Sequence, residues 1–161
     1  MPSPQGPAEQ IKEHSRIVVG VDGSEESSRA LDWAVGEAQV RNAELNILHA
    51  YLFRTVVEEK TPQRFRKDRD VLEGALARAA KLAPELPTVG TLTEPPARDA
   101  LVAASAGADL LVVGARGLGG VGQLMLGSVS SHCVHHAHCP VVVVRSAPAV
   151  IGTGSGALLD H

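Results

Sequence analysis

Several kinds of residue are scarce in this chain, and each scarcity excludes a class of protein. Among its 161 residues there are one Trp, one Tyr, two Phe and two Cys. Two cysteines are too few for a disulfide-stabilised secreted scaffold. No apolar stretch reaches the length that spans a bilayer, and the opening segment MPSPQGPAEQIKEH has no apolar core like that of a signal peptide. We therefore expect a reduced, cytoplasmic protein with no membrane partner.

Excess basic charge is also lacking. The chain has 15 Lys and Arg against 18 Asp and Glu, a net charge of −3 at pH 7 and an isoelectric point near 6.1. Proteins that bind nucleic acid without sequence preference need a basic footprint, so no nucleic-acid partner is expected. With few aromatic residues available, the core must consist of Val, Leu, Ile and Ala, which suits helices packed on a parallel sheet.

Apolar runs and amphipathic stretches alternate along the chain. Runs rich in β-branched residues predict strands at 16–22, 44–51, 88–93, 109–113 and 140–145. Amphipathic stretches predict helices at about 24–41, 66–83, 97–106 and 127–137, with an irregular connection at 52–65. Residues 1–14 and 147–161 are predicted to be flexible tails on one domain at 15–146.

This alternation predicts an α/β fold. Right-handed strand–helix–strand crossovers build an open, doubly wound parallel sheet that helices cover on both faces. Such sheets bind ligands in a crevice at the carboxyl ends of their strands. Asp22, Ala50 and Gly114 follow or end predicted strands, so each of them is expected at that crevice.

The segment from Gly114 to Ser128, GARGLGGVGQLMLGS, contains six glycines between a buried strand and a helix. Glycine lets backbone N–H groups converge on an anion, and a helix N-terminus adds further donors, so the segment predicts a phosphate site. No Lys adjoins Ser128, as a P-loop would require, and the first strand ends in GVDGS rather than in a dinucleotide-binding fingerprint. A mobile surface linker is the alternative interpretation.

The glycine spacing resembles that of a known family. Gly114-x-x-Gly117, nine residues and then Gly127-Ser128 match the G-2x-G-9x-G-[S/T] signature of the ATP-binding branch of the universal stress protein family. IVVGVDGS (17–24), LNILHAY (45–51), ADLLVVGARGLGG (108–120) and CPVVVVR (139–145) extend the resemblance over about residues 16–145.

The resemblance implies a fold and a set of binding residues. The fold is a three-layer α/β/α sandwich, Rossmann-like and similar to the adenine nucleotide alpha hydrolases, with five parallel strands in the order 3-2-1-4-5. Asp22, preceded by Gly20, would lie at the adenosine end of bound ATP, and Ala50 would contact adenine through its backbone. The remaining implied contacts, to ribose and phosphates, come from Gly114, Arg116, Gly117, Gly119, Gly120, Gly127, Ser128 and Val129, and Mg²⁺ is expected to accompany the ATP.

The resemblance also implies a homodimer through the last strand, where Val141–Val144 would otherwise be a bare edge. Arg116 is the one cation in the glycine segment and would face a phosphate or the solvent. One departure concerns Glu94, which lies near a position where many relatives have a glycine before the third helix. It predicts a site mouth that differs in shape or charge.

Asp22 also has simpler interpretations. It suits a turn or helix cap ahead of the first helix. A phosphorylated receiver domain is disfavoured, because it needs a second acidic neighbour and an acceptor Asp after the third strand, where the chain has Thr91-Leu92-Thr93.

The run SHCVHHAHC at 131–139 contains four His and two Cys. His132 and His136 share a helix face at a spacing that can chelate zinc, but no further ligands are fixed in geometry, so surface or structural roles are favoured. Cys133 and Cys139 are expected to remain thiols rather than to pair.

The function predicted from these patterns is that of an ATP-binding, nucleotide-responsive dimer in a stress response, rather than that of a dedicated enzyme. Two alternatives stay open. One is a slow ATP-hydrolysing or nucleotidyl-transferring enzyme of the same architecture, although the chain lacks H-x-G-H and S-G-G-x-D-S segments. The other is a dimeric interaction module that binds no nucleotide.

Overall fold

The computed structural model describes residues 14–51, 62–116 and 125–146, and in these ranges strands and helices alternate as predicted. The strands are β1 (Arg16–Gly20), β2 (Glu44–Ala50), β3 (Thr88–Thr93), β4 (Leu110–Gly114) and β5 (Val141–Val144). The helices are α1 (Glu25–Arg41), α2 (Pro62–Leu82), α3 (Ala97–Ser105) and α4 (Ser128–His136). The predicted tails at 1–14 and 147–161 lie outside the described residues, apart from His14.

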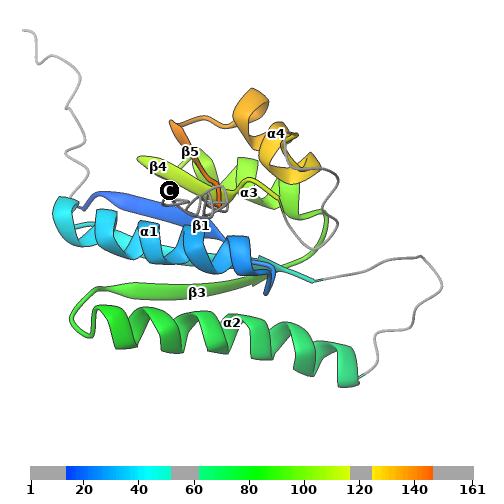
Figure 1. Cartoon of the computed structure of the whole chain (residues 1–161), viewed down its shortest axis with the longest axis horizontal. Coiled ribbons are helices and arrows are strands. Elements are labelled where there is room, and N and C mark those ends of the chain that lie inside the picture. The colour runs from blue at the N-terminus through cyan, green and yellow to red at the C-terminus, as the bar shows by residue number, and fades with distance from the viewer. Residues whose placement is uncertain (1–13, 52–61, 117–124, 147–161) are drawn as a thin grey trace, which may run out of the picture.

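The strands form one parallel sheet in the order β3-β2-β1-β4-β5, which confirms the α/β fold and the predicted strand order (Figure 1). From β1 the chain moves outward through β2 to β3, then returns to place β4 on the other side of β1. The carboxyl ends of β1 and β4 therefore flank the point where the winding reverses, and such a point leaves a crevice beyond the strand ends.

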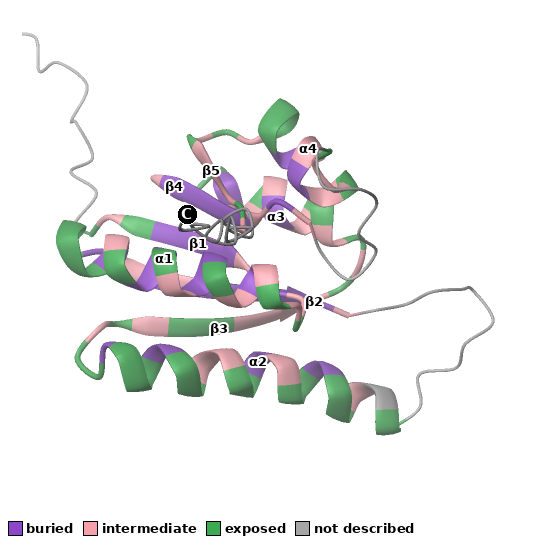
Figure 2. Cartoon of the chain, in the orientation of Figure 1, coloured by how far each residue is buried: buried purple, intermediate pink, exposed green. Residues whose placement is uncertain are grey.

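Two apolar clusters hold helices to the two faces of the sheet. On one face, alternate strand residues such as Val19 and Ile47 pack with buried residues of α1 and α2. On the other, Val18 and Leu111 pack with α3 and α4. Figure 2 shows the central strands as mostly buried, as expected for a parallel sheet covered on both faces.

Helix α1 has the boundaries that its sequence predicts. The Ser24 side chain accepts a hydrogen bond from the Ser27 N–H at 3.2 Å and caps the N-terminus, with Glu25 and Glu26 in the first turn. Asn42, in the left-handed conformation at φ 51°, ends the helix. Its apolar residues recur at the three- and four-residue spacing of one helix face and are buried, namely Ala30, Leu31, Ala34, Val35 and Ala38.

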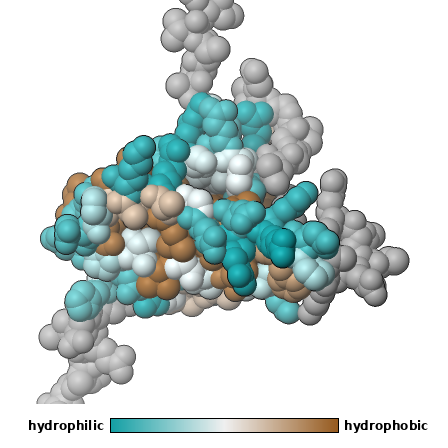
Figure 3. Space-filling view, turned by 90° about the horizontal axis from the view of Figure 1, so that it is seen from below, coloured by the Kyte–Doolittle hydropathy of each residue, from teal (hydrophilic) through white to brown (hydrophobic). Residues whose placement is uncertain are grey.

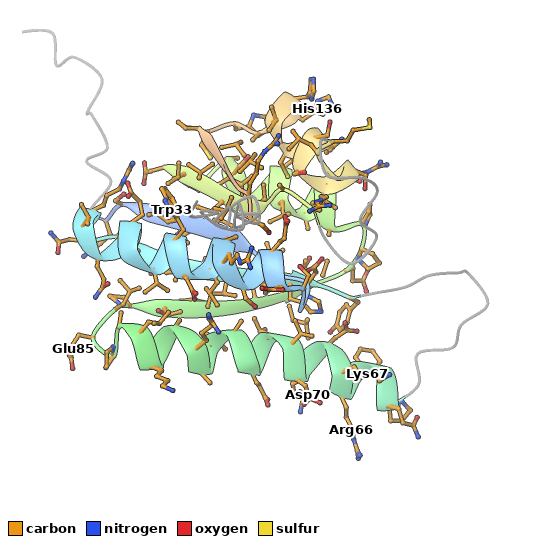
Figure 4. The ribbon with its side chains drawn as sticks, in the orientation of Figure 1. Trp33, Arg66, Lys67, Asp70, Glu85 and His136 are labelled. Carbon is orange, nitrogen blue, oxygen red and sulfur yellow. The ribbon has the colours of Figure 1, made fainter. Side chains whose placement is uncertain are left out.

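The start of α2 was predicted wrongly. The helix begins at Pro62 and not near residue 66, so the end of the expected irregular connection is helical. The segment PQRFRKDR is mostly charged and shows no clear helical spacing of apolar residues. Proline nevertheless suits the first helical turn, because its missing N–H is not needed there. In Figure 3 hydrophilic residues cover much of the face seen from below Figure 1, and in Figure 4 Arg66 and Asp70 of α2 point away from the sheet.

Large apolar side chains are exposed only at scattered positions in the described ranges, among them Trp33 on α1 and Val134 on α4. Single exposed apolar residues are ordinary on a protein surface. Met125 is 71% exposed. Of the helices described, none is long and apolar enough to cross a membrane.

Candidate functional site

Residues predicted to bind a ligand gather where the strands end. Gly20 is the last residue of β1, Ala50 of β2 and Gly114 of β4. Because the strands are parallel, these three residues lie at the same end of the sheet, which we call its carboxyl edge. Asp22 lies just beyond β1, where the preceding Val21 N–H still donates to the Leu48 carbonyl at 2.9 Å.

Asp22 shapes the turn between β1 and α1. Its Oδ1 accepts the Ser24 N–H at 2.9 Å, and its own N–H donates to the Ser27 Oγ at 3.3 Å. These bonds support the turn interpretation of the aspartate. The residue is half-buried just beyond β1. None of these contacts involves a nucleotide, so the role of Asp22 at the adenosine end stays a prediction.

Two glycines at this edge allow helices to approach the sheet closely. A Cβ on Gly20 would lie 3.0 Å from a methyl group of Leu101 in α3. A Cβ on Gly114 would lie 3.1 Å from the backbone carbon of Glu26 in α1. Both contacts are tighter than ordinary packing, so these positions have a structural reason for glycine in addition to the predicted ligand contact.

The two ends of the glycine segment are fastened together. The Ala115 carbonyl accepts the Gly127 N–H at 2.7 Å and the Ser130 hydroxyl at 2.8 Å, while the Ala115 N–H donates to the Val144 carbonyl at 2.8 Å. We call residues 114–116 and 127–130 the loop neck. The neck places the start of α4 directly beside the end of β4, although ten residues lie between Arg116 and Gly127 in the sequence.

Helix α4 begins in a way that suits an anion. Its N-cap residue, Gly127, makes no side-chain capping bond. An α-helix leaves its first N–H groups without intrahelical acceptors, so the Ser128 and Val129 amides and the exposed Ser128 hydroxyl are the donors that the neck offers. The Gly127 N–H is used within the neck instead, so this glycine closes the loop.

Sequence reasoning missed the partner of Arg116. Glu26 Oε2 accepts the Arg116 backbone N–H at 2.9 Å, and Glu26 Oε1 lies 3.3 Å from the Arg116 guanidinium and 2.9 Å from the Ser146 hydroxyl. Arg116 therefore contacts α1, and its predicted contact with a phosphate stays a prediction. Burial acts to raise the pKa of Glu26, but hydrogen bonds from the Arg116 backbone, Ser146 and the guanidinium outweigh it and lower the pKa below 4.5.

With this geometry in place, the family is settled by comparison. The model of the universal stress protein family matches residues 13–145. The chain belongs to the universal stress protein family. It is 32% identical to Universal stress protein YxiE of Bacillus subtilis over 146 residues, covering 81% of this chain and 99% of the relative. A universal stress protein of Thermus aquaticus is 37% identical over 143 residues, which cover 80% of this chain and 97% of that protein.

Solved structures agree on the fold. A universal stress protein crystallised in complex with cAMP has a TM-score of 0.66 and 29% sequence identity, covering 83% of this chain and 99% of its own.

The family signature is only partly visible in the described residues. Gly114, Gly127 and Ser128 meet at the loop neck, whereas Gly117, Gly119 and Gly120 lie outside the described residues. The predicted ligand contacts of all these positions, and of Gly20, Ala50 and Val129, stay predictions.

Sequence reasoning also missed a buried hydrogen-bonded pair near the strand ends of this universal stress protein, formed by His49 and Asp68. His49, only 1% exposed, places Nδ1 2.8 Å from the Val21 carbonyl and Nε2 2.9 Å from Oδ1 of Asp68 on α2. A carbonyl only accepts, so Nδ1 must carry a proton, and a second proton must lie between Nε2 and the carboxyl group. The pair ties the segment before Asp22 to α2. The histidine within the apolar strand segment LNILHAY was the one feature of the sequence that could have indicated this pair.

The histidines of the run at 131–139 lie on the partly or fully exposed side of α4 and just after it. The rings of His132 and His136 lie 4.4 Å apart, as their spacing predicts, and His132 Nε2 lies 3.4 Å from Asp99 of α3. Figure 4 shows His136 at the outer side of the helix. Within the described part of the chain no group of three or more potential ligands could hold a metal ion. Cys133 is buried, and it is not bonded to Cys139.

Proposed function

We propose that this universal stress protein binds ATP at the carboxyl edge of its sheet and acts as a nucleotide-responsive regulator in the cytoplasm. The observation that carries the proposal is the loop neck, which brings the uncapped start of α4 beside the ends of β4 and β1. The amides of Ser128 and Val129 would hold phosphates there. Structural similarity to a universal stress protein in complex with cAMP supports an adenine nucleotide.

The rest of the nucleotide would follow the strand ends. Asp22 and the backbone of Ala50 would contact the adenosine part, and the glycine segment would cover ribose and phosphates. Mg²⁺ would enter with the nucleotide, because no described cluster of side chains forms a metal site and phosphate oxygens suit this ion.

Binding, rather than turnover, is the proposed activity. ATP held by the loop neck would stabilise the folded state by mass action and alter the surface that the glycine segment presents to a partner. A second copy of the chain would pair along β5, which lies at the edge of the sheet.

Isothermal titration with Mg-ATP tests the proposal. Gly127→Asp places a carboxylate in the loop neck, and we expect it to weaken ATP binding at least about tenfold, because the new charge repels phosphate. Gly36→Asp is the matched control, since Gly36 is exposed on α1 and an added Cβ there meets nothing within 4 Å. A wild-type protein that binds no adenine nucleotide, or a Gly127→Asp variant that binds as well as the control, contradicts the proposal.

A further inference from the structure

A single carboxylate joins the glycine segment to two other elements. Glu26, in the first turn of α1, accepts hydrogen bonds from the Arg116 backbone at 2.9 Å and from Ser146, just past β5, at 2.9 Å. It also forms an ion pair with the Arg116 guanidinium at 3.3 Å. The Glu26 side chain is only 13% exposed, so water screens this arrangement weakly.

The ion pair decides what charge the glycine segment offers. From Gly114 to Ser128, Arg116 is the only charged residue. The guanidinium and the backbone N–H of Arg116 are both hydrogen-bonded to Glu26, so the charge of Arg116 is compensated. The loop neck therefore presents backbone amides and hydroxyls to a ligand. Amide donors bind one phosphate well, but they gain little from the further negative charges of a longer phosphate chain.

We propose that Glu26 is a positioning residue that sets the phosphate-chain selectivity of the site by holding Arg116 against α1. This inference rests on the proposed nucleotide-binding function. Without the Glu26 charge, the guanidinium loses its ion pair with α1 and a carboxylate that repels phosphate disappears from the loop neck. Both changes favour ATP over AMP, because ATP carries the greater negative charge.

Hydrogen bonds from Ser146 and from the Arg116 backbone hold the Glu26 carboxylate independently of the Arg116 side chain. Oε1 is shared between Ser146 and the guanidinium, while Oε2 binds the Arg116 backbone. The carboxylate therefore stays in place even if the arginine side chain turns away. Its first-turn neighbour Glu25 is a natural contrast, since it is exposed and pairs only with Arg29 of its own helix in the described contacts, at 2.6 Å.

The test is the ratio of the AMP and ATP dissociation constants, measured by titration calorimetry on the full chain. In Glu26→Gln we expect the preference for ATP to rise about fivefold over wild type, the size of one modest ionic contact. The control Glu25→Gln removes the same charge one residue away and should keep the wild-type ratio. An unchanged ratio in Glu26→Gln, or an equal rise in Glu25→Gln, overturns the inference.

A double variant, Glu26→Gln with Arg116→Gln, keeps the test decisive if Glu26→Gln fails to fold. It removes both charges together and leaves no unpaired ion, so we expect it to fold and to return the ratio to the wild-type value. A preference for ATP that falls clearly below wild type in the double variant means that Arg116 already binds phosphate, and the inference is then wrong.

The two proposals fail differently. A wild-type protein that binds neither AMP nor ATP removes the proposed function and this inference together. A wild-type protein that binds both, with a ratio that ignores the Glu26 charge, removes the inference alone.

Discussion

At the scale of single residues, two carboxylates, the buried Asp68 and the half-buried Glu26, connect the strand ends to the helices around them. Asp68 reaches His49 from α2, and Glu26 reaches Arg116 from α1. Each contact fixes backbone next to a predicted ligand position, since His49 also holds the Val21 carbonyl and Glu26 holds the Arg116 N–H. Substitutions at these carboxylates should therefore affect both stability and the site.

For the buried pair, the chemistry of the replacement decides the cost. An asparagine at position 68 can donate from its amide to the neutral Nε2 of His49, whereas an alanine leaves that nitrogen unpaired. We expect Asp68→Asn to lower the free energy of unfolding by about 1 kcal/mol and Asp68→Ala by about 2–3 kcal/mol. Urea denaturation at pH 7 measures both. Equal losses in the two variants would mean that packing, not the hydrogen bond, is what the aspartate supplies.

The Glu26 carboxyl should make stability depend on acid. Its pKa is lowered in the folded state, so its contribution is present above its ordinary pKa of 4.5 and is lost as the pH falls through the folded value. We expect Glu26→Gln to unfold at lower urea concentration than wild type at pH 7, and the difference to shrink as the pH is lowered from 5 toward 3. A difference that stays constant over this range would show that the charge contributes nothing.

The buried thiol should be unreactive. Burial raises the pKa of Cys133 to about 11, against an ordinary value of 9.0, and only the thiolate attacks alkylating reagents. We expect iodoacetamide at pH 8 to modify folded Cys133 about a hundredfold more slowly than unfolded Cys133. Peptide mapping with and without urea measures this. Similar rates in the two states would place the thiol in contact with solvent.

At the scale of elements, the meeting of α1 with the end of β4 depends on a missing side chain. Gly114→Ala would put a methyl group about 3.1 Å from the Glu26 backbone, so we expect it to destabilise the fold by about 1–3 kcal/mol. Gly74→Ala is the control, because this α2 glycine has open space around it and helices favour alanine by about 0.5–1 kcal/mol. Thermal melts compare the two, and an unaffected Gly114→Ala would show that the helix moves aside freely.

Features set by neighbouring residues could be predicted from the sequence, whereas contacts between distant residues could not. The strands and most helices follow from local periodicity, as the buried stripe of α1 illustrates. The strand order then places the candidate site at the carboxyl ends of the strands. The bond between Glu26 and Arg116 joins residues 90 apart, and no local pattern distinguishes Glu26 from the exposed Glu25 beside it. Likewise, the start of α2 depends on a proline among charged residues that carry no clear helical period.

At the scale of the whole molecule, the sheet has an apolar edge. The Pro140 carbonyl accepts the Leu111 N–H of β4 at 3.0 Å, and the Val144 carbonyl accepts the N–H of Ala115, just past β4, at 2.8 Å. Backbone groups alternate along a strand, so those of Val141 and Val143 point away from β4, toward the side of β5 on which no other described strand lies. All four valines of β5 are half-buried. A bare edge of this kind invites pairing with another strand.

The proposed homodimer can therefore be tested with one backbone donor. Val143→Pro removes an outward N–H while leaving the bonds to β4 in place, and we expect it to shift the protein from dimer to monomer in size-exclusion chromatography with light scattering. Val143→Ala is its control, because it loses most of the same side chain but keeps the N–H, and it should remain dimeric. Circular dichroism should show both variants folded, since proline is tolerated on edge strands. If wild type is already a monomer at micromolar concentration, or if Val143→Pro still dimerises, the second copy does not pair along β5.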